Sequence, residues 1–473
     1  MKLHQITLAL ILSGIAFSSA AANESIEAKA IPKTIFKNVN VFNGTENKLI
    51  TGCNVVVEKN VIKQACAKSF SSAEGDTVID GKGRTLMPGL IDAHVHLNLQ
   101  NLANPAGIDG VSLMTWEEVG ALAYAASQEY LFSGFTTVRD LCGSHDGLRT
   151  HIEKGTLTGP RIYLSGACIS QTSGHGDWRT RGQAMGDDGN KTGVAQELGI
   201  VILADGADEV LKATRNNLAG GADFTKMMAG GGVTSTRDPL HSIQGTQAEL
   251  EAMVTADKQW DTYGAVHAYS DDSVTNALNA GVLSIEHGNL MTKRSTFELV
   301  KAKGAFVVPA LAGFSDQLLK HPLYGNPDMP MRAKVMQLIE NKDNWFKLAN
   351  ETNINIGFGT DIVVSSVAAS RSIRDFQMGM FDEGLGTFET LHAMTGANGK
   401  LMAFTGKNNP YPNKLGVIEV GAYADIILVD GNPLKDLSVL GATYDMWAAP
   451  RTTRDIKTIP LIMKDGKIYV NEL

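Results

Sequence analysis

Four histidines stand at the ends of short apolar runs, a placement that suits metal binding. His94 and His96 close the run LIDAHVH, His267 ends YGAVHA and His287 ends LSIEHG. Because a β-strand repeats every two residues, the imidazoles of His94 and His96 point to one side and can share one metal ion. Each histidine taken alone also fits a buried core residue, and the His-x-His pair also fits a surface or core pair.

Two further residues extend this pattern. Lys226 lies in DFTKMM, where a buried amine is costly unless it is neutralised, paired or chemically changed. Asp361 follows INIGFGT, where a helix N-cap is the alternative. Because these six residues of metal-binding types fall at the ends of five apolar runs, the first, fourth, fifth, sixth and eighth along the chain, we predict that they form one metal site.

The middle of the chain alternates apolar β-like runs with segments of helical length and spacing. This rhythm is typical of an α/β fold of the (β/α)8 TIM-like barrel type, in which the carboxyl ends of the strands face the active site. A doubly wound open sheet is the alternative, but the number of runs and the polar residues at their ends favour the barrel. The β-like runs are Leu90–His96, Phe135–Leu141, Arg161–Gly166, Asp223–Met228, Ala265–Ala268, Leu283–His287, Ala305–Pro309 and Ile354–Gly359. The helical segments include Thr115–Phe132, Gln247–Tyr263, Asp271–Ala280 and Ser295–Lys303.

Short β-like runs separated by Gly, Asn and Asp turns occupy both ends of the chain. We therefore predict a small β-sandwich domain built from both termini, residues 23–87 and 410–473, beside a barrel of residues 88–409. The β-like runs cover Ile35–Val78, Gly416–Val420, Ala424–Val429 and Ile456–Val470.

The first 22 residues have the features of an export signal peptide. Lys2 supplies the charged start, Ile6–Phe17 is a mostly apolar run of 12 residues, and Ala20–Ala22 fits a small-residue cleavage site. A buried N-terminal helix is the alternative, since a run this short does not span a bilayer. No later stretch is long and apolar enough to do so. We therefore expect a secreted or periplasmic chain without a membrane span in its mature form.

Export would place the four cysteines in an oxidising compartment, where disulfides persist. Two short β-like runs meet at a two-residue loop, 59–60, and this loop places Cys53 opposite Cys66 in a non-hydrogen-bonded pair. We therefore predict a disulfide between Cys53 and Cys66, with two buried thiols as the alternative. Cys142 and Cys168 follow two other apolar runs and can be free, paired or buried.

The composition limits the classes of partner. Hydrophobic residues make up 43% of the 473 residues and charged residues 19%, which fits a chain that buries a full core and excludes disordered, collagen-like or coiled-coil chains. The net charge of −8, without a Lys/Arg-rich block, argues against nucleic acid or an anionic membrane surface as the main partner. The glycine run 230–232 is followed by no Lys-Ser/Thr pair, so it indicates a loop that approaches the site closely rather than a phosphate loop.

Several motifs resemble those of the amidohydrolase superfamily, in the expected order and over nearly all of the chain. They are TLMPGLIDAHVH (85–96), SIEHG (284–288), FGTD (358–361) and KLGVIEVGAYADIILVDGNPL (414–434). The resemblance implies a hydrolase with two divalent metal ions. Zinc is the default for such ligands, with manganese, cobalt and iron as alternatives.

The resemblance assigns a role to each predicted ligand. Lys226 would react with carbon dioxide to give N6-carboxylysine, a carbamate that bridges both metal ions and turns a buried cation into an anion. The more buried metal ion would be bound by His94, His96 and Asp361, and the other by His267 and His287.

The reaction implied by this centre is hydrolysis of an amide bond. Water held between two divalent cations loses a proton near neutral pH and can attack the substrate carbonyl. Asp361 would take the proton as a general base and return it to the leaving amine. His145, in RDLCGSHDG, would donate to the carbonyl oxygen as it becomes an oxyanion, and a loop histidine without this role is the alternative.

Within the superfamily, the chain is most similar to the imidazolonepropionase-related branch. That branch includes Xaa-Pro and Xaa-Arg/Lys dipeptidases, carboxypeptidase-like enzymes and ochratoxin-hydrolysing amidases. Imidazolonepropionases themselves have one metal ion and lack the bridging lysine, so Lys226 argues against that activity. The similar segments are SGHGDWR (173–179), KMMAGGGVTSTRDP (226–239), VHAYSDDSV (266–274) and AGVLSIEHG (280–288).

Enzymes of this branch cleave an amide beside a free carboxylate, so we expect a cationic or hydroxyl clamp. Arg237 can hold a carboxylate through two parallel hydrogen bonds, with a solvated loop arginine as the alternative, and His175 and Tyr269 would shape the pocket. The resulting prediction is a dipeptidase or carboxypeptidase of Xaa-Pro or Xaa-Arg/Lys type that forms a homo-oligomer. The alternatives are an amidase of N-acyl amino acids or ochratoxin-like amides, and a non-catalytic scaffold with the same fold.

Overall fold

The computed structural model describes residues 31–100, 107–185, 192–363, 365, 367–448 and 456–473. Pro32–Leu473 form one compact unit. The predicted signal peptide, residues 1–22, lies outside the described residues. The predicted domain boundaries, at residues 87–88 and 409–410, stay a prediction.

Parallel strands alternate with helices through the middle of the chain, and each of the eight predicted runs contains a strand. Two further short strands, β9 (Cys168–Ser170) and β10 (Val201–Leu203), were not expected from the sequence. The strands in the predicted runs are β6 (Leu90–Val95), β7 (Phe135–Asp140), β8 (Arg161–Leu164), β11 (Thr225–Met228), β12 (Gly264–Ser270), β13 (Ser284–Leu290), β14 (Phe306–Val308) and β15 (Asn355–Ile356).

These strands close into a ring. β6, β7 and β8 form one parallel sheet, and the other has the order β10-β9-β11-β12-β13-β14-β15. The Asp223 amide, just before β11, donates to the Leu164 carbonyl of β8 at 2.8 Å, and the Ala93 amide of β6 donates to the Phe358 carbonyl, just after β15, at 2.9 Å, so the two sheets are joined on both sides. The fold is therefore the predicted TIM-like α/β barrel and not an open doubly wound sheet.

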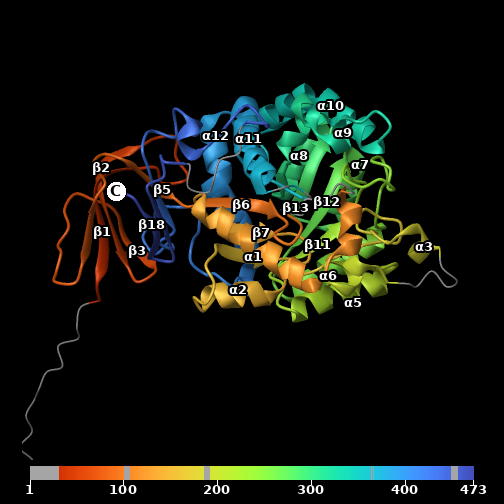
Figure 1. Ribbon diagram of the computed structural model, residues 1–473, viewed down its shortest axis with the longest axis horizontal. Helices are drawn as coiled ribbons and strands as arrows, with labels where there is room; N and C mark the ends of the chain where they lie inside the picture. Colours follow the sequence, from red (N-terminus) through yellow and green to blue (C-terminus); the bar gives the residue numbers. More distant parts are fainter. Residues whose placement is uncertain (1–30, 101–106, 186–191, 364, 366, 449–455) are drawn as a thin grey trace, which may run out of the picture. The chain divides into compact units, whose positions relative to one another are not determined.

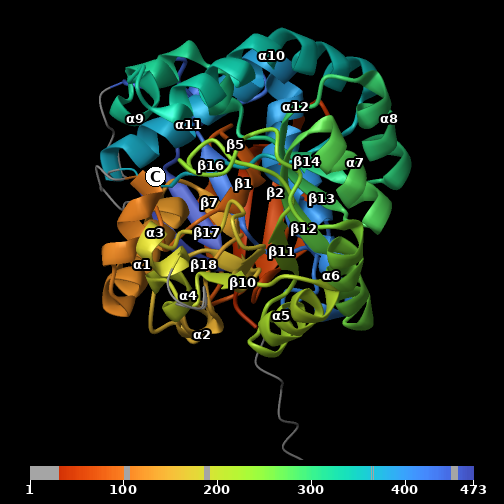
Figure 2. The same cartoon turned by 90° about the vertical axis from the view of Figure 1, so that its right-hand side faces the viewer.

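Helices surround the ring of strands (Figure 2). Thr246 and Glu249 form a reciprocal cap at the start of α6, and Gly304, with a φ of 64°, ends α8 in the left-handed conformation that glycine allows. The α-helices are α1 (Trp116–Phe132), α2 (Asp146–Glu153), α3 (Arg181–Ala184), α4 (Val194–Glu197), α5 (Ala207–Ala219), α6 (Gln247–Gln259), α7 (Asp271–Ala280), α8 (Arg294–Lys303), α9 (Pro322–Gly325), α10 (Pro330–Thr352), α11 (Val367–Leu385), α12 (Thr387–His392) and α13 (Asn398–Met402).

Strands from both ends of the chain lie side by side in one mixed eight-stranded sheet, in red and blue in Figure 1. Its order is β18-β17-β16-β5-β1-β2-β3, with β4 also paired to β1. The prediction of a two-sheet sandwich is not confirmed, and residues 416–420, predicted as a β-like run, form no strand. The strands are β1 (Lys33–Val41), β2 (Ile50–Glu58), β3 (Val61–Ala67), β4 (Thr77–Asp80), β5 (Thr85–Pro88), β16 (Ile426–Val429), β17 (Leu461–Lys464) and β18 (Lys467–Asn471).

The predicted disulfide between Cys53 and Cys66 is present, and it links β2 to β3. The register of β2 and β3 differs from that of the regular hairpin assumed in the prediction. Glu58 faces Val61 at the turn as expected, but two irregularities farther out bring Asn54 opposite Ala67. A second disulfide joins Cys142, just after β7, to Cys168 at the start of β9. The sequence alone did not indicate whether Cys142 and Cys168 are free, paired or buried.

Candidate active site

Strand periodicity brings the predicted ligands to one end of the barrel. On β11, Lys226 and Met228 line the same pocket. The hydroxyl of the preceding residue, Thr225, instead donates a hydrogen bond to the buried Asp257 of α6. On β12, His267 and Tyr269 point inward in the same way. We call this cavity the metal pocket. It is lined by all the predicted ligands, His94, His96, Lys226, His267, His287 and Asp361, together with Leu99, Cys142, His175, Trp178, Met228, Val233, Thr234, Tyr269 and Val363.

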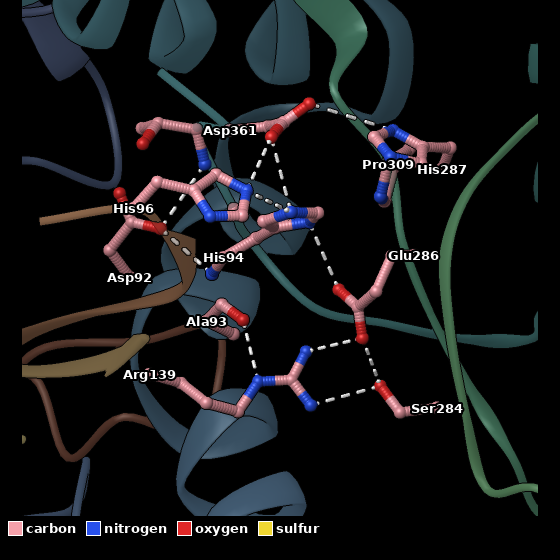
Figure 3. Close-up of polar contacts among 12 residues, drawn as sticks. Asp92, Ala93, His94, His96, Arg139, Ser284, Glu286, His287, Pro309 and Asp361 are labelled. Atoms are coloured by element: carbon pink, nitrogen blue, oxygen red, sulfur yellow. Dashed lines mark hydrogen bonds and ion pairs between the residues drawn. The ribbon is translucent and has the colours of Figure 1, made fainter. Parts of the chain in front are cut away.

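Three of these side chains converge on one point (Figure 3). Nε2 of His94 and Nε2 of His96 lie 3.2 Å and 3.0 Å from Oδ1 of Asp361, and the two nitrogens lie 3.2 Å from each other. Nδ1 of His287 lies 3.8 Å from the other oxygen of Asp361. Asp361 therefore stands between the histidines of β6 and the histidine of β13.

His267 and His287 form a second group beside this cluster. Their ring centroids are 4.4 Å apart, and the Tyr269 ring stacks on His287 at 4.5 Å. His175 stacks on His267 at 4.2 Å, with its Nδ1 3.1 Å from a carboxylate oxygen of the buried Asp238. The structure thus places His175 and Tyr269, predicted as pocket residues, directly against the predicted ligands.

Backbone conformation helps to aim two of the ligands. His287 has a φ of 77° and Asp361 a φ of 49°, both in the left-handed region that non-glycine residues rarely adopt. Such strain typically persists at functional sites, where the surrounding structure imposes it. Gly359 permits the close approach of this loop, because a Cβ there would lie 2.6 Å from the Cβ of His94.

A buried ion pair beneath the cluster was not predicted from the sequence. Oε2 of Glu286 lies 3.1 Å from Nδ1 of His94, and its Oε1 accepts a hydrogen bond from Arg139 at 2.7 Å (Figure 3). Arg139 also donates to the Ala93 carbonyl and to the Ser284 hydroxyl. Glu286 is fully buried, and burial alone would raise its pKa, but Arg139, His94 and Lys226 together hold that pKa well below the usual range. In the sequence, this ion pair could have been suspected from Glu286, a charged residue within the apolar run that ends in the predicted ligand His287.

Two imidazoles and the carboxylate of the cluster have protonation states that suit metal binding. Burial lowers the pKa of His96 to about 4 and that of His287 well below its ordinary value, so both rings are neutral near pH 7. Burial also lowers the pKa of the third imidazole, His94, but Asp361 and Glu286 outweigh burial and raise that pKa above its usual value. Burial alone would raise the pKa of Asp361, but the facing imidazoles, chiefly His94, hold it well below its usual range. Neutral imidazoles and an ionised carboxylate are the forms that bind metal ions.

Lys226 differs from an ordinary lysine in the same pocket. Its side chain is almost fully buried, and burial lowers its pKa to about 8, although the charges of Glu286 and Asp361 oppose this shift. A buried amine is most stable when it is neutral, paired or chemically changed.

The donor set fits a divalent metal ion such as zinc. Two ligand atoms on one tetrahedral zinc ion, each bound at about 2.1 Å, lie about 3.4 Å apart. The separations of 3.0–3.8 Å among His94, His96, His287 and Asp361 agree with this value. The contact between Glu286 and the second nitrogen of His94 also has the form of the carboxylate that orients a metal-bound histidine.

A second cavity, which we call the outer pocket, continues from the metal pocket. The two share Val233, Thr234, Tyr269, Asp361 and Val363. Counted together with the open solvent at its mouth, its volume is about 920 Å³. Its remaining lining is Ala310, Ala312, Gly313, Leu318, His321, Leu323, Tyr324, Leu338, Thr360, Ile362, Ser365, Ile373, Met446 and Trp447.

Two predicted residues lie outside both pockets. His145 is exposed at the start of α2, and its ring lies against Gly199. Arg237 is also exposed, and its guanidinium donates to the Arg179 carbonyl. The structure brings neither side chain to the predicted ligands.

The chain belongs to the amidohydrolase family, whose model matches residues 85–468. The ochratoxinase of Aspergillus niger is 28% identical over 395 residues, which cover 81% of this chain and 75% of that protein. The crystal structure of a prolidase complexed with N-methylphosphonate-L-proline has a TM-score of 0.78 at 30% identity. A Xaa-Pro dipeptidase with bound methionine in the active site has a TM-score of 0.75 at 29% identity. Each structural match covers 93% of this chain and 100% of the other.

The fold, the site and these relatives together identify a metal-dependent hydrolase that acts on amide bonds. The non-catalytic scaffold considered from the sequence does not fit this result. Among the described residues, no helix has the length and apolar character needed to cross a membrane.

Proposed function

We propose that this chain is an exported hydrolase with two metal ions that cleaves the amide bond of a small substrate bearing a carboxylate, namely a dipeptide of the Xaa-Pro or Xaa-Arg/Lys type. One observation carries the proposal. The metal pocket holds two pairs of histidines, a buried lysine and an ionised aspartate within reach of each other. In such a centre His94, His96 and Asp361 would hold one metal ion, His267 and His287 would hold the other, and carboxylated Lys226 would be a ligand shared by both.

The bound metal ions would supply an activated water molecule and polarise the substrate carbonyl. Asp361 is placed to receive the proton of that water and to pass it to the leaving amine, because it faces the centre of the cluster and stays ionised. We assign the hydrogen bond to the substrate carbonyl to His175, which packs against His267. His145 and Arg237 line neither pocket, and the roles predicted for them stay predictions.

Recognition of the carboxylate then falls to neutral donors. The outer pocket has no arginine or lysine in its described lining, whereas the hydroxyls of Thr234 and Tyr269 line its junction with the metal pocket. We propose that these hydroxyls form the clamp. An amidase of N-acyl amino acids or ochratoxin-like amides is the second candidate, and the relation to ochratoxinase over most of the chain favours keeping it.

Export is supported by the two disulfides, which persist in oxidising compartments, and by the signal-like residues 1–22. We further propose a homo-oligomer, which light scattering of the purified protein would test.

The activity is tested with the purified protein, stripped of metal by a chelator and reloaded with zinc. Released amino acids are measured with Xaa-Pro, Xaa-Arg and N-acyl amino acid substrates. We expect hydrolysis by the reloaded protein only, and a loss of about a thousandfold or more in Asp361→Asn. The proposal fails if no substrate is cleaved after reloading, or if the stripped protein remains as active as the reloaded one.

A further inference from the structure

The outer pocket has walls that are almost entirely apolar or aromatic. They are formed by Leu318, Leu323, Leu338, Ile373, Tyr324 and Trp447. None of the described residues that line it is a lysine or an arginine, and Asp361, at the junction with the metal pocket, is its one carboxylate. Asp316 and Asp445 line a separate surface hollow and not this pocket.

His321, the one histidine among the described residues that line the outer pocket, is held in its neutral form. Its Nδ1 accepts a hydrogen bond from the Leu323 amide at 3.2 Å, so this nitrogen carries no proton. The ring packs against Tyr324, with centroids 5.2 Å apart, and against Trp447 at 6.0 Å. The three rings therefore make an uncharged aromatic wall.

Hydrogen bonds hold this wall of the outer pocket in place. Gln317 holds residues 444–447 through its side-chain amide, which donates to the Tyr444 carbonyl at 3.0 Å and accepts from the Met446 amide at 2.9 Å. Its backbone carbonyl accepts from Nε1 of Trp447 at 2.8 Å. A preformed pocket binds its ligand without first losing conformational entropy of its own.

We propose that the outer pocket binds a large uncharged side chain of the substrate, apolar or aromatic, and excludes the side chains of arginine and lysine. The inference rests on the proposed amide hydrolysis and narrows it, because it removes the Xaa-Arg/Lys substrates. A cation placed here would lose its hydration without gaining a buried carboxylate, since Asp361 is committed to the histidine cluster. An apolar side chain would gain from burial against the same walls.

Substrate preference tests the inference directly. Two series of dipeptides are compared, one varying the acyl residue and one varying the leaving residue, each with Gly, Leu, Phe, Lys and Glu. We expect kcat/KM for Phe or Leu to exceed that for Lys by at least about tenfold in one of the series. Equal or higher values for Lys in both series would overturn the inference.

Binding without turnover separates this inference from the proposed function. N-acetylphenylalanine and N-acetyllysine are titrated into the metal-loaded protein by calorimetry. We expect binding of N-acetylphenylalanine to be tighter by about tenfold or more. Such a preference without hydrolysis of any substrate would overturn the proposed function alone. Hydrolysis of both series without any preference would overturn the inference alone.

Charge placed on the wall supplies a second test. Leu323→Glu should lower kcat/KM for Phe substrates by about tenfold and raise it for Lys substrates, whereas Leu323→Gln, of similar size, should not favour Lys. Leu113→Glu, at a position 77% exposed and outside the pocket, is the matched control and should change neither. Unchanged kcat/KM for the Gly substrates would show that the metal pocket is intact. The inference fails if Leu323→Glu leaves the preference unaltered.

Discussion

Glu286 and His287, neighbours on β13, both face the interior of the barrel. Regular strand alternation would turn one of them outward, but the positive φ of His287 breaks the alternation. Glu286 therefore reaches Nδ1 of His94 on β6, while His287 reaches Asp361 (Figure 3). One strand thus supplies both a predicted ligand and the carboxylate that orients another.

The role of Glu286 can be measured through metal affinity. Glu286→Gln keeps the size of the side chain but weakens its hold on His94, so we expect zinc to bind about 10- to 100-fold more weakly. Competition with a chromophoric chelator gives the affinity, and Glu298→Gln, on the exposed face of α8, is the control. Equal zinc affinities in Glu286→Gln and the native protein would contradict an orienting role.

The two disulfides should both stabilise the fold but differ in their effect on zinc binding. Each closes a loop of moderate length, so replacing either cysteine pair by alanine should lower the free energy of unfolding by about 3 kcal/mol. Cys142 lines the metal pocket, whereas the disulfide between Cys53 and Cys66 lies in the mixed eight-stranded sheet built from both ends of the chain. Only Cys142→Ala/Cys168→Ala should therefore also weaken zinc binding. Denaturant unfolding and chelator competition measure the two effects, and equal zinc affinity in both double variants would refute the distinction.

A buried carboxyl group behind β11 should make stability depend on pH. Asp257 bonds the Thr225 hydroxyl at 2.9 Å, and burial raises the pKa of Asp257 from 3.8 to about 7. Between these two values the folded state holds more protons than the unfolded state, so this group's contribution to the free energy of unfolding falls as pH rises from about 4 to about 7.

Asp257→Asn should remove this pH-dependent fall in the free energy of unfolding. Relative to the native protein, the variant should gain up to about 4 kcal/mol in free energy of unfolding between pH 4 and pH 7.5. Urea unfolding at several pH values measures the difference, in which changes common to both proteins cancel. Asp272→Asn, at an exposed position, should run parallel to the native curve. A parallel curve for Asp257→Asn itself would show that this carboxyl is ionised in the fold.

Local periodicity was sufficient to predict the barrel and the convergence of the predicted ligands in one pocket. The common direction of His94 and His96 follows from strand alternation, and the position of the pocket follows from the rule that the carboxyl ends of barrel strands form the site. The closing of the ring needed contacts between residues far apart in the sequence, such as Asp223 with Leu164.

Features set by loops and irregular backbone were beyond such reasoning. Arg237 and His145 sit on loops whose direction the sequence does not fix, and neither lines the metal pocket or the outer pocket. The register of β2 and β3 shifts at bulges that no residue pattern marked, although the disulfide still forms. The outer pocket combines residues 311–325 with residues 444–447, segments whose contact depends on Gln317.

The proposed carbamate on Lys226 gives the most direct test of the two-metal centre. Stripped protein is reloaded with zinc in ¹³C-bicarbonate, and metal content and the ¹³C spectrum are recorded for the native chain and for Lys226→Met. We predict about two zinc ions per native chain with one carbamate resonance, and neither the resonance nor the full metal content in the variant. A native chain that binds a single zinc ion and shows no carbamate resonance would contradict the two-metal centre.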